Sequence, residues 1–325
     1  MFAIIGKRSG WCLMALVLIL SLASCTTAQA PGDGVGEPSG GARPPLPEKI
    51  QTGEGEEPTV KVYVTDDAAV KSMPIEEYLA GVLAGEMKND WPLEALKAQA
   101  ILARTFTLRF MTEKESKYEG ADVSTDIEEA QAYDADGVND RILQAIEETR
   151  GLALTYNGEF PYSWFFAHSG GKTALAKEGL EYAEDEPGYT QVVEGRDSED
   201  APEEAKAWTA QFSPEQVMDA ANAEGELQTI EIGERGESGR ATTILINDQP
   251  YPAASLRIAL GSTEMRSTLL DEIRLEDGTV IISGKGYGHG VGMPQWGAYS
   301  MAEEGSEAEE ILKYYFKDVA IEKMW

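Results

Sequence analysis

Histidine and cysteine are scarce in this chain of 325 residues, which contains two of each. His168 and His289 cannot form a His-Glu-x-x-His zinc site, and an isolated histidine is more often a hydrogen-bonded structural residue than a metal ligand. Cys12 falls within a predicted signal peptide, so Cys25 alone would remain, which excludes a disulfide framework and a cysteine-based metal site. We therefore predict no metal and no cofactor.

Positive charge is also in short supply, with 27 lysines and arginines against 57 aspartates and glutamates and a net charge of −30. This balance excludes a nucleic-acid partner, because phosphate binding requires a basic surface. Much of the acidity lies in residues 178–204, where eleven acidic residues accompany a single basic one, Arg196. That composition predicts an exposed loop or insertion.

The N-terminal apolar run, Trp11 to Ala23, is too short to span a membrane comfortably, and it follows Lys7 and Arg8. It ends in Leu-Ala-Ser-Cys25, which resembles the bacterial lipobox, whose cysteine is diacylated and becomes the new N-terminus. We expect residues 1–24 to be a lipoprotein signal peptide and Cys25 to anchor the protein to the membrane outside the cytoplasm. An uncleaved signal anchor is the alternative.

The stretch after Cys25 lacks the composition of a core. Residues 26–58 contain six prolines and seven glycines among 33 positions. Such a segment is typical of a flexible tether. We therefore expect residues 25–58 to form the lipidated cysteine and its linker, and residues 59–325 to form the folded domain.

Short elements of both kinds alternate along residues 59–325. The pattern predicts a strand at 60–64, helices at 74–88, 91–111 and 139–150, and a capping box at Ser213. Asn157-Gly158 and Asp277-Gly278 are typical two-residue hairpin turns. Hairpins in place of regular βαβ units indicate an α+β fold with mixed, largely antiparallel sheets.

The first predicted helix carries a carboxylate on its apolar face. Five apolar side chains share that face: Ile75, Tyr78, Leu79, Val82 and Leu83. Glu86 lies about 20° from Ile75 around the helix, in the centre of the stripe, whereas Glu76 and Glu77 point elsewhere. Burial raises the pKa of a carboxyl group, so Glu86 is a candidate general acid. Alternatively, Glu86 reaches solvent at the helix end or pairs with Arg104 or Lys97.

Glycine occupies every second position of residues 284–292, GKGYGHGVG. Alternating glycine weakens a strand, so it indicates that something packs closely against the backbone. The approaching partner is either another segment of the protein or a flat ligand such as a sugar. Elsewhere, His168 to Thr173 fails the phosphate-loop pattern because position 166 is Phe, and no Gly-x-Ser-x-Gly nucleophile motif occurs.

Three longer blocks resemble a known family. MPIEEYLAGVLAGEMKNDWPLEALKAQAILARTFTL resembles the opening signature of the stage II sporulation protein D/amidase-enhancer (SpoIID/LytB) family. FFAHSGGKT is similar to its middle motif, and GKGYGHGVGMPQWGAYSMAEEGSEAEEILKYYF to its C-terminal motif. The blocks stand in the family's order and bracket nearly all of residues 59–325, apart from the acidic stretch.

The resemblance implies a peptidoglycan lytic transglycosylase that cleaves glycan strands between N-acetylmuramic acid and N-acetylglucosamine and leaves 1,6-anhydro ends. The family's catalytic glutamate corresponds to Glu86, in the helical pair beside a glycan-binding groove. We expect substrate contacts from residues of all three blocks: Arg104, His168, Ser169, Gly170, Gly171, Tyr287, His289, Gln295 and Trp296. Some members carry zinc before the segment matching Gln131-Ala132-Tyr133, but ADVSTDIEEAQAY has neither His nor Cys.

Two other functions compete with the enzyme. The same fold could grip glycan strands without cutting them and stimulate a separate cell-wall amidase. It could instead be a lipid-anchored scaffold for other sporulation proteins. Only the enzyme predicts new anhydro ends on glycan strands.

Overall fold

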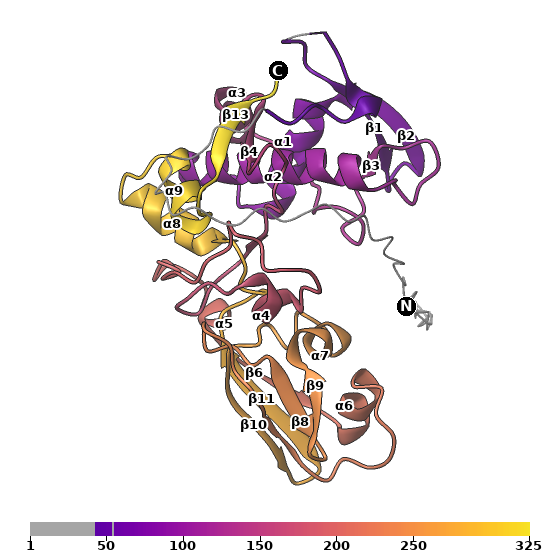
Figure 1. Cartoon of the computed structure of the whole chain (residues 1–325), viewed down its shortest axis with the longest axis vertical. Helices are drawn as coiled ribbons and strands as arrows, with labels where there is room; N and C mark the ends of the chain where they lie inside the picture. The colour runs from indigo at the N-terminus through magenta and orange to yellow at the C-terminus, as the bar shows by residue number, and fades with distance from the viewer. Residues whose placement is uncertain (1–42, 54) are drawn as a thin grey trace, which may run out of the picture. The chain divides into compact units, whose positions relative to one another are not determined.

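A computed structural model describes residues 43–53 and 55–325 (Figure 1). The predicted signal peptide and Cys25 lie outside these residues. Within the described ranges, no helix combines the length and apolar composition needed to cross a membrane.

One hydrophobic core is built by helices around a central one (Figure 1). The central helix α2, Leu93–Glu113, contacts four others: α1 (Ile75–Glu86), α3 (Asp140–Glu148), α8 (Gln295–Glu303) and α9 (Ala308–Tyr315). Its alanines at 95, 98, 100 and 103 are buried, and these small side chains let neighbouring helices approach closely. Pro74 and Pro92 cap α1 and α2, where a missing N–H costs no helical hydrogen bond.

Small sheets flank this helical core. In the first, β1 (Thr59–Val64) pairs antiparallel with β2 (Ala69–Pro74) and parallel with β3 (Val123–Ser124). In the second, β4 (Leu152–Thr155) pairs antiparallel with β13 (Ala320–Lys323). In the third, β5 (Phe165–Phe166) pairs parallel with β12 (Met293–Pro294). The last two pairings bring C-terminal segments back to the middle of the chain.

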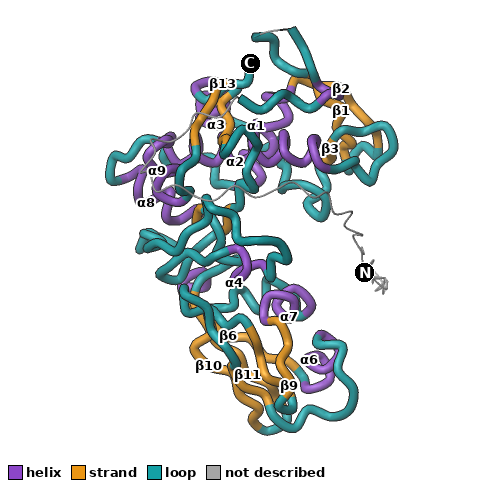
Figure 2. Tube along the Cα trace, viewed as in Figure 1, coloured by secondary structure: helices purple, strands orange, loops and turns teal. Residues whose placement is uncertain are grey.

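A second hydrophobic core lies between strands and two short helices, where Figure 2 shows most of the longer strands. One sheet has the order β10 (Leu270–Glu276), β11 (Thr279–Lys285), β6 (Ala207–Phe212), and is antiparallel throughout. The other has the order β7 (Ile230–Ile232), β8 (Thr243–Ile246), β9 (Gln249–Pro252). The helices are α6 (Pro214–Ala220) and α7 (Ala253–Ala259). Helices together with small, mostly antiparallel sheets confirm the α+β prediction.

The predicted turns form, but only one opens a long hairpin. Asp277 and Gly278 have positive φ angles of 49° and 76° and join β10 to β11. Asn157 and Gly158 also have positive φ angles, yet the pairing stops at Tyr156 and Glu159. Pro161 follows and cannot donate to a ladder, so β4 pairs with β13 instead. The capping box at Ser213 is confirmed at the start of α6.

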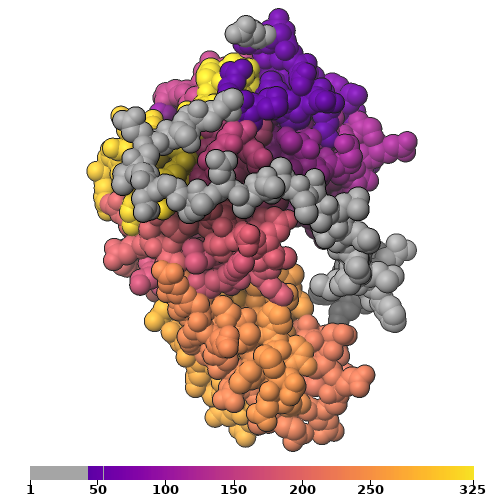
Figure 3. Space-filling view, viewed as in Figure 1, coloured from indigo at the N-terminus to yellow at the C-terminus, as the bar shows by residue number. Residues whose placement is uncertain are grey.

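Part of the expected tether belongs to the folded body. A short 3₁₀ helix, η1 (Glu48–Ile50), places Ile50 in the first core at 3% exposure. Arg43 donates a hydrogen bond of 2.8 Å to the carbonyl of Lys323, so the beginning and end of the described chain lie side by side (Figure 3). The predicted tether, residues 25–58, therefore includes packed chain at residues 43–50, because Ile50 supplies apolar area that tertiary contacts can bury.

The acidic stretch 178–204 is only partly an exposed loop. It overlaps α4 (Ala176–Leu180) at one end and α5 (Glu203–Lys206) at the other. Glu178 is buried and accepts hydrogen bonds from the Ser238 hydroxyl and the Arg240 amide. Glu186 accepts from the first two amides of α4. Several acidic residues of this stretch thus accept hydrogen bonds from backbone and side-chain donors. The charge composition alone does not predict these bonds.

Candidate functional site

Glu86 is the last residue of α1 and lies where two surface depressions meet. The first, of about 540 Å³, is lined by residues 84–90, Asp134 and Gly137. The second, of about 340 Å³, is lined by residues from five parts of the chain: Glu86, Met87, Lys88, Trp91, Ala167, Pro202, Glu204, Ala205, Arg266, Tyr287, Gln295 and Trp296. Among the carboxylates lining them, Glu86 alone lines both.

The Glu86 carboxyl group is half-buried and has one hydrogen-bond partner among the residues that the structure describes. Its Oε1 accepts a hydrogen bond of 2.7 Å from the Ala132 amide. Burial raises the pKa of Glu86, and the Ala132 hydrogen bond opposes that rise by stabilising the charged form. The carboxyl group therefore holds its proton to higher pH than an ordinary glutamate, which suits a general acid.

Neither basic residue considered as a partner for Glu86 lies beside it. Lys97 pairs with Glu94 at 2.8 Å and with Glu148 at 3.2 Å. Arg104 pairs with Glu76 instead. The end of α1 is held from another side, where the Gln295 side chain donates a hydrogen bond of 3.1 Å to the carbonyl of Glu86. Gln295 thereby ties the C-terminal block to the candidate acid.

Aromatic rings form a wall of the second depression. The rings of Trp91 and Trp296 lie 4.5 Å apart between centroids, and both pack against Tyr299. Trp296 is 8% exposed, so most of its surface is packed and only a small part can face a ligand. Tyr287 is half-buried on the same depression, with the Arg266 guanidinium 5.3 Å from its ring centroid. Aromatic surface of this kind is suited to stacking against a sugar.

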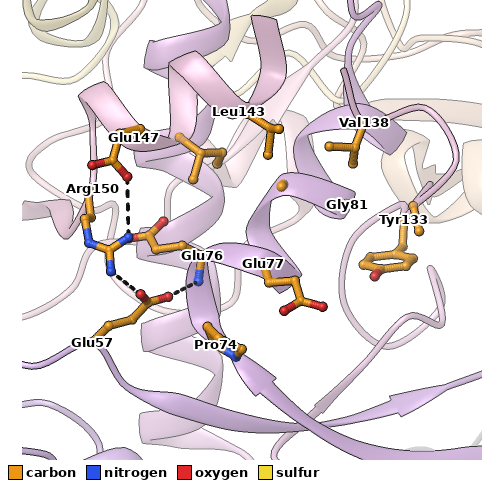
Figure 4. A pocket seen from close by; sticks show the side chains of 13 residues that line it. Glu57, Pro74, Glu76, Glu77, Gly81, Tyr133, Val138, Leu143, Glu147 and Arg150 are labelled. Carbon is orange, nitrogen blue, oxygen red and sulfur yellow. Dashed lines mark hydrogen bonds and ion pairs between the residues drawn. The ribbon is translucent and has the colours of Figure 1, made fainter. Parts of the chain in front are cut away.

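Arg104 is not at the depressions, contrary to the sequence-based expectation. Its side chain is 0% exposed, and its guanidinium makes a two-pronged ion pair with Glu76, with N–O distances of 2.6 and 3.1 Å. It also donates to the carbonyl of Leu152 at 2.8 Å. Glu76 is buried as well and accepts from the Gly151 amide (Figure 4 shows Glu76 beside Glu57 and Arg150). Burying a carboxylate is costly unless it is paired and hydrogen-bonded, and Arg104 provides both for Glu76. Through its bonds to Glu76 and Leu152, Arg104 joins α1 to α2 and β4.

The predicted contacts of the middle block, residues 168–171, bond within the protein and line neither depression, although Ala167 of the same block lines the second one. The backbones of His168 and Tyr287 pair with each other at 2.8 and 3.0 Å. His168 Nδ1 accepts from the Gly170 amide, and burial lowers the pKa of His168. Ser169 is fully buried, with its amide and hydroxyl donating to Asp197. Gly171 is exposed, with a φ of 135° that favours glycine.

His289 likewise lines neither depression. Its Nδ1 accepts a hydrogen bond of 3.0 Å from the Val291 amide, and its ring lies 5.5 Å from that of Phe166. Burial, together with the charges of Arg257 and Arg240, lowers the pKa of His289 to about 3. The imidazole is therefore neutral near pH 7 and has a structural environment. Of the nine predicted substrate contacts, the structure gathers Tyr287, Gln295 and Trp296 around Glu86.

The alternating glycines meet other parts of the same protein. Beyond Lys285 the chain leaves β11, and the four glycines 286, 288, 290 and 292 all have positive φ angles. A Cβ added at Gly286 would lie 2.8 Å from the carbonyl oxygen of His168, and one at Gly290 would lie 2.4 Å from the Arg240 guanidinium carbon. Residues 286–292 therefore pack closely against other segments of the same protein. Of the two partners that the sequence allows, these glycines favour a protein segment over a sugar.

We expect Gly290→Val to lower the free energy of unfolding by at least about 2 kcal/mol, from backbone strain together with displacement of buried Arg240. Gly305→Val is the matched control, because Gly305 has a φ of 94°, close to the 90° of Gly290, and has nothing near its missing Cβ. Chemical denaturation of both variants would measure the difference. Equal losses would show that contact with Arg240 is unimportant.

The structure adds residues that pattern analysis did not single out. Lys88 and Trp91 stand just after Glu86 in the first family-like block, so their closeness in sequence was an available signal. Arg266 comes from a loop outside all three blocks, and Ala132 contributes only its backbone amide. Arg266 has no signature in the sequence, whereas Ala132 lies in the segment Gln131-Ala132-Tyr133 that matches the family, although no side-chain pattern indicates the role of its amide.

Comparisons with known proteins identify the family. The family model described as stage II sporulation protein matches residues 63–156, which include Glu86. An uncharacterised protein of Brachyspira hyodysenteriae is 34% identical over 260 residues, covering 78% of this chain and 67% of the relative. Stage II sporulation protein D of Bacillus amyloliquefaciens is 31% identical over 292 residues, covering 84% of this chain and 83% of the relative.

The amidase enhancer of Bacillus subtilis is 26% identical over an alignment of 294 residues that covers 73% of this chain and 39% of the relative. The resemblance of the three sequence blocks and the extent of these alignments agree. This chain belongs to the stage II sporulation protein D/amidase enhancer (SpoIID/LytB) family.

Proposed function

We propose that this protein is a peptidoglycan lytic transglycosylase with Glu86 as its catalytic residue, acting in cell-wall remodelling during sporulation. The observation that carries the proposal is the position of Glu86, a half-buried carboxyl group with a raised pKa, at the junction of two depressions. A glycan strand is a linear polymer, so a cleavage site needs room for sugar units on both sides of the scissile bond. The two depressions supply that room.

In the proposed reaction, the Glu86 carboxyl group donates its proton to the glycosidic oxygen as the bond to the muramic acid C1 breaks. The 6-hydroxyl of the same muramic acid then attacks C1, and the Glu86 carboxylate accepts the hydroxyl proton. The product is a 1,6-anhydro ring, and Glu86 is returned to its protonated form. Ordinary glycosidases require a second carboxylate to activate water or attack the sugar, but here the substrate supplies the nucleophile.

Digestion of purified glycan strands tests this proposal. An enzyme shortens the strands and creates chain ends in proportion to time and protein concentration. A protein that only binds strands creates no new ends, whatever its affinity. Size-exclusion analysis of the strands before and after incubation distinguishes these outcomes.

A second candidate is supported by the relative of Bacillus subtilis that is named amidase enhancer. In that case the depressions around Glu86 would grip glycan and the protein would stimulate a separate cell-wall amidase. Amidase activity measured with and without this protein would rise, and Glu86→Gln would stimulate as well as wild type. Scaffolding of other sporulation proteins would instead require no glycan affinity.

We further propose that the protein acts outside the cytoplasm, anchored by a lipid on Cys25. Cys25→Ser should abolish acylation and leave an unprocessed precursor, because signal cleavage at a lipobox depends on the modified cysteine. Mass spectrometry of the purified N-terminal peptide checks this expectation. Acyl chains on the Cys25→Ser protein would contradict it.

A further inference from the structure

We propose that residues 131–134 form a positioning loop whose Ala132 amide orients the Glu86 carboxyl group for proton transfer. The inference rests on the proposed function for its catalytic meaning, and on the described contacts for its geometry. The Ala132 amide donates to Glu86 Oε1 at 2.7 Å, a short, well-formed hydrogen bond. It is the one hydrogen bond to the Glu86 carboxylate among the described residues.

The loop is fixed on both sides of Ala132. Before it, Gln131 is buried, and its side-chain amide donates to the carbonyl of Ala103 and the hydroxyl of Thr107 on α2, both at 3.4 Å. After it, the Asp134 amide donates to the carbonyl of Gly81 on α1 at 2.9 Å. A donor held from two helices has little freedom to turn away, so the direction of the Ala132 N–H is set before substrate arrives.

Two glycines of α1 make this arrangement possible. A Cβ at Gly81 would lie 2.3 Å from the ring of Tyr133, which stands beside Gly81 in Figure 4 and stacks with Tyr78 at 5.9 Å. A Cβ at Gly85 would lie 2.6 Å from the Tyr133 amide nitrogen and 2.7 Å from the Ala132 carbonyl carbon. Glycine is a poor residue for a helix interior, and these two contacts explain its presence in α1.

The key variant is Gly85→Ala. Alanine has a higher helix propensity than glycine, so Gly85→Ala would stabilise the protein if it affected α1 alone. The added Cβ, however, must also displace the backbone of the loop. We expect turnover to fall on the order of 100-fold, as for a displaced catalytic contact. We also expect activity to fall at a higher pH than in wild type. The Ala132 N–H stabilises the charged carboxylate and so lowers the pKa of Glu86, and losing this donor should raise that pKa further. The charged side chains lining the neighbouring depressions are Lys88, Asp90, Asp134, Glu204 and Arg266.

Glu77→Gln, on an exposed position of the same helix, is the control and should keep the wild-type rate and pH profile. A Gly85→Ala protein with lower turnover but an unshifted pH profile would indicate a structural role only, and would overturn the proposal. A Gly85→Ala protein with wild-type activity would overturn it as well.

A measurement on the unaltered sequence avoids dependence on the folding of a variant. In an NMR titration, the Ala132 amide proton should shift with one carboxyl titration, and this shift should vanish in Glu86→Gln. An Ala132 amide that does not titrate would overturn the proposal. If it titrates while no glycan is cleaved, the loop does orient Glu86 and the proposed enzymatic function is what fails.

Discussion

Replacing Glu86 by glutamine should lower turnover on glycan strands by about 10²–10⁴-fold, the usual contribution of a general acid–base group. Glutamine keeps the size of the side chain and can still accept from the Ala132 amide, but it has no proton to give. Binding should persist, because the walls formed by Trp91, Tyr287 and Arg266 are unchanged. Product release and strand affinity measured on the same preparations separate these effects.

The proposed role of Glu86 also predicts the direction in which activity changes with pH. Because burial raises the pKa of Glu86, the proton needed for the first step remains in place at pH values where an ordinary glutamate has lost it. Activity should therefore be retained below the raised pKa and fall as pH increases through it. Glu77→Gln, the exposed glutamate of the same helix, is the control and should follow the wild-type profile. An active Glu86→Gln protein would remove Glu86 from the mechanism.

Arg104→Met should be strongly destabilising, costing about 3–5 kcal/mol of unfolding free energy. The substitution leaves Glu76 buried without its cation and leaves the carbonyl of Leu152 without a donor. Since α1, α2 and β4 meet at this pair, the loss should appear as a lower midpoint in urea denaturation. Lys313→Met, which breaks an exposed ion pair with Glu309, should change stability by less than about 1 kcal/mol.

A second substitution shows whether the missing charge partner is the cause. Replacing Glu76 by leucine in the Arg104→Met protein removes the stranded carboxylate, so the double variant should be more stable than Arg104→Met alone. If the losses of unfolding free energy from the two substitutions simply add in the double variant, the effect of Arg104→Met comes from lost packing volume and not from the uncompensated charge. Binding of glycan by Arg104, as first expected, predicts lost affinity at unchanged stability.

Helical periodicity predicts that Glu86 lies on the apolar face of its helix, and the structure has it half-buried at the end of α1, because the apolar stripe and its one charged member lie on a single element. The apolar stripe does not predict which charged side chains form ion pairs, because that pairing depends on how the helices pack against one another. Glu76 lies off that stripe and yet is buried, since α2 and β4 cover that side of α1. The expectation that Arg104 lies at the groove fails for the same reason, because its sequence block carries no information on the direction of its side chain.

Loops and backbone groups were the least predictable parts of the site. Alternating glycines indicated close approach, but both a sugar and a protein segment satisfy that pattern, and only the φ angles and neighbours of Gly286 and Gly290 distinguish them. The charge of the acidic stretch predicts only an exposed loop or insertion, whereas Glu178 and Glu186 bond to specific amides and hydroxyls. The Ala132 amide has no side-chain signature at all.

Mass spectrometry of glycan strands digested in ¹⁸O-labelled water is the most direct test of the central claim. Wild-type protein should release fragments ending in 1,6-anhydro-N-acetylmuramic acid, lighter than the hydrated fragments by one water and free of ¹⁸O. Glu86→Gln should release almost none. Fragments with hydrated, ¹⁸O-containing reducing ends would identify a hydrolase and contradict the account, and intact strands after prolonged incubation would identify a binding protein.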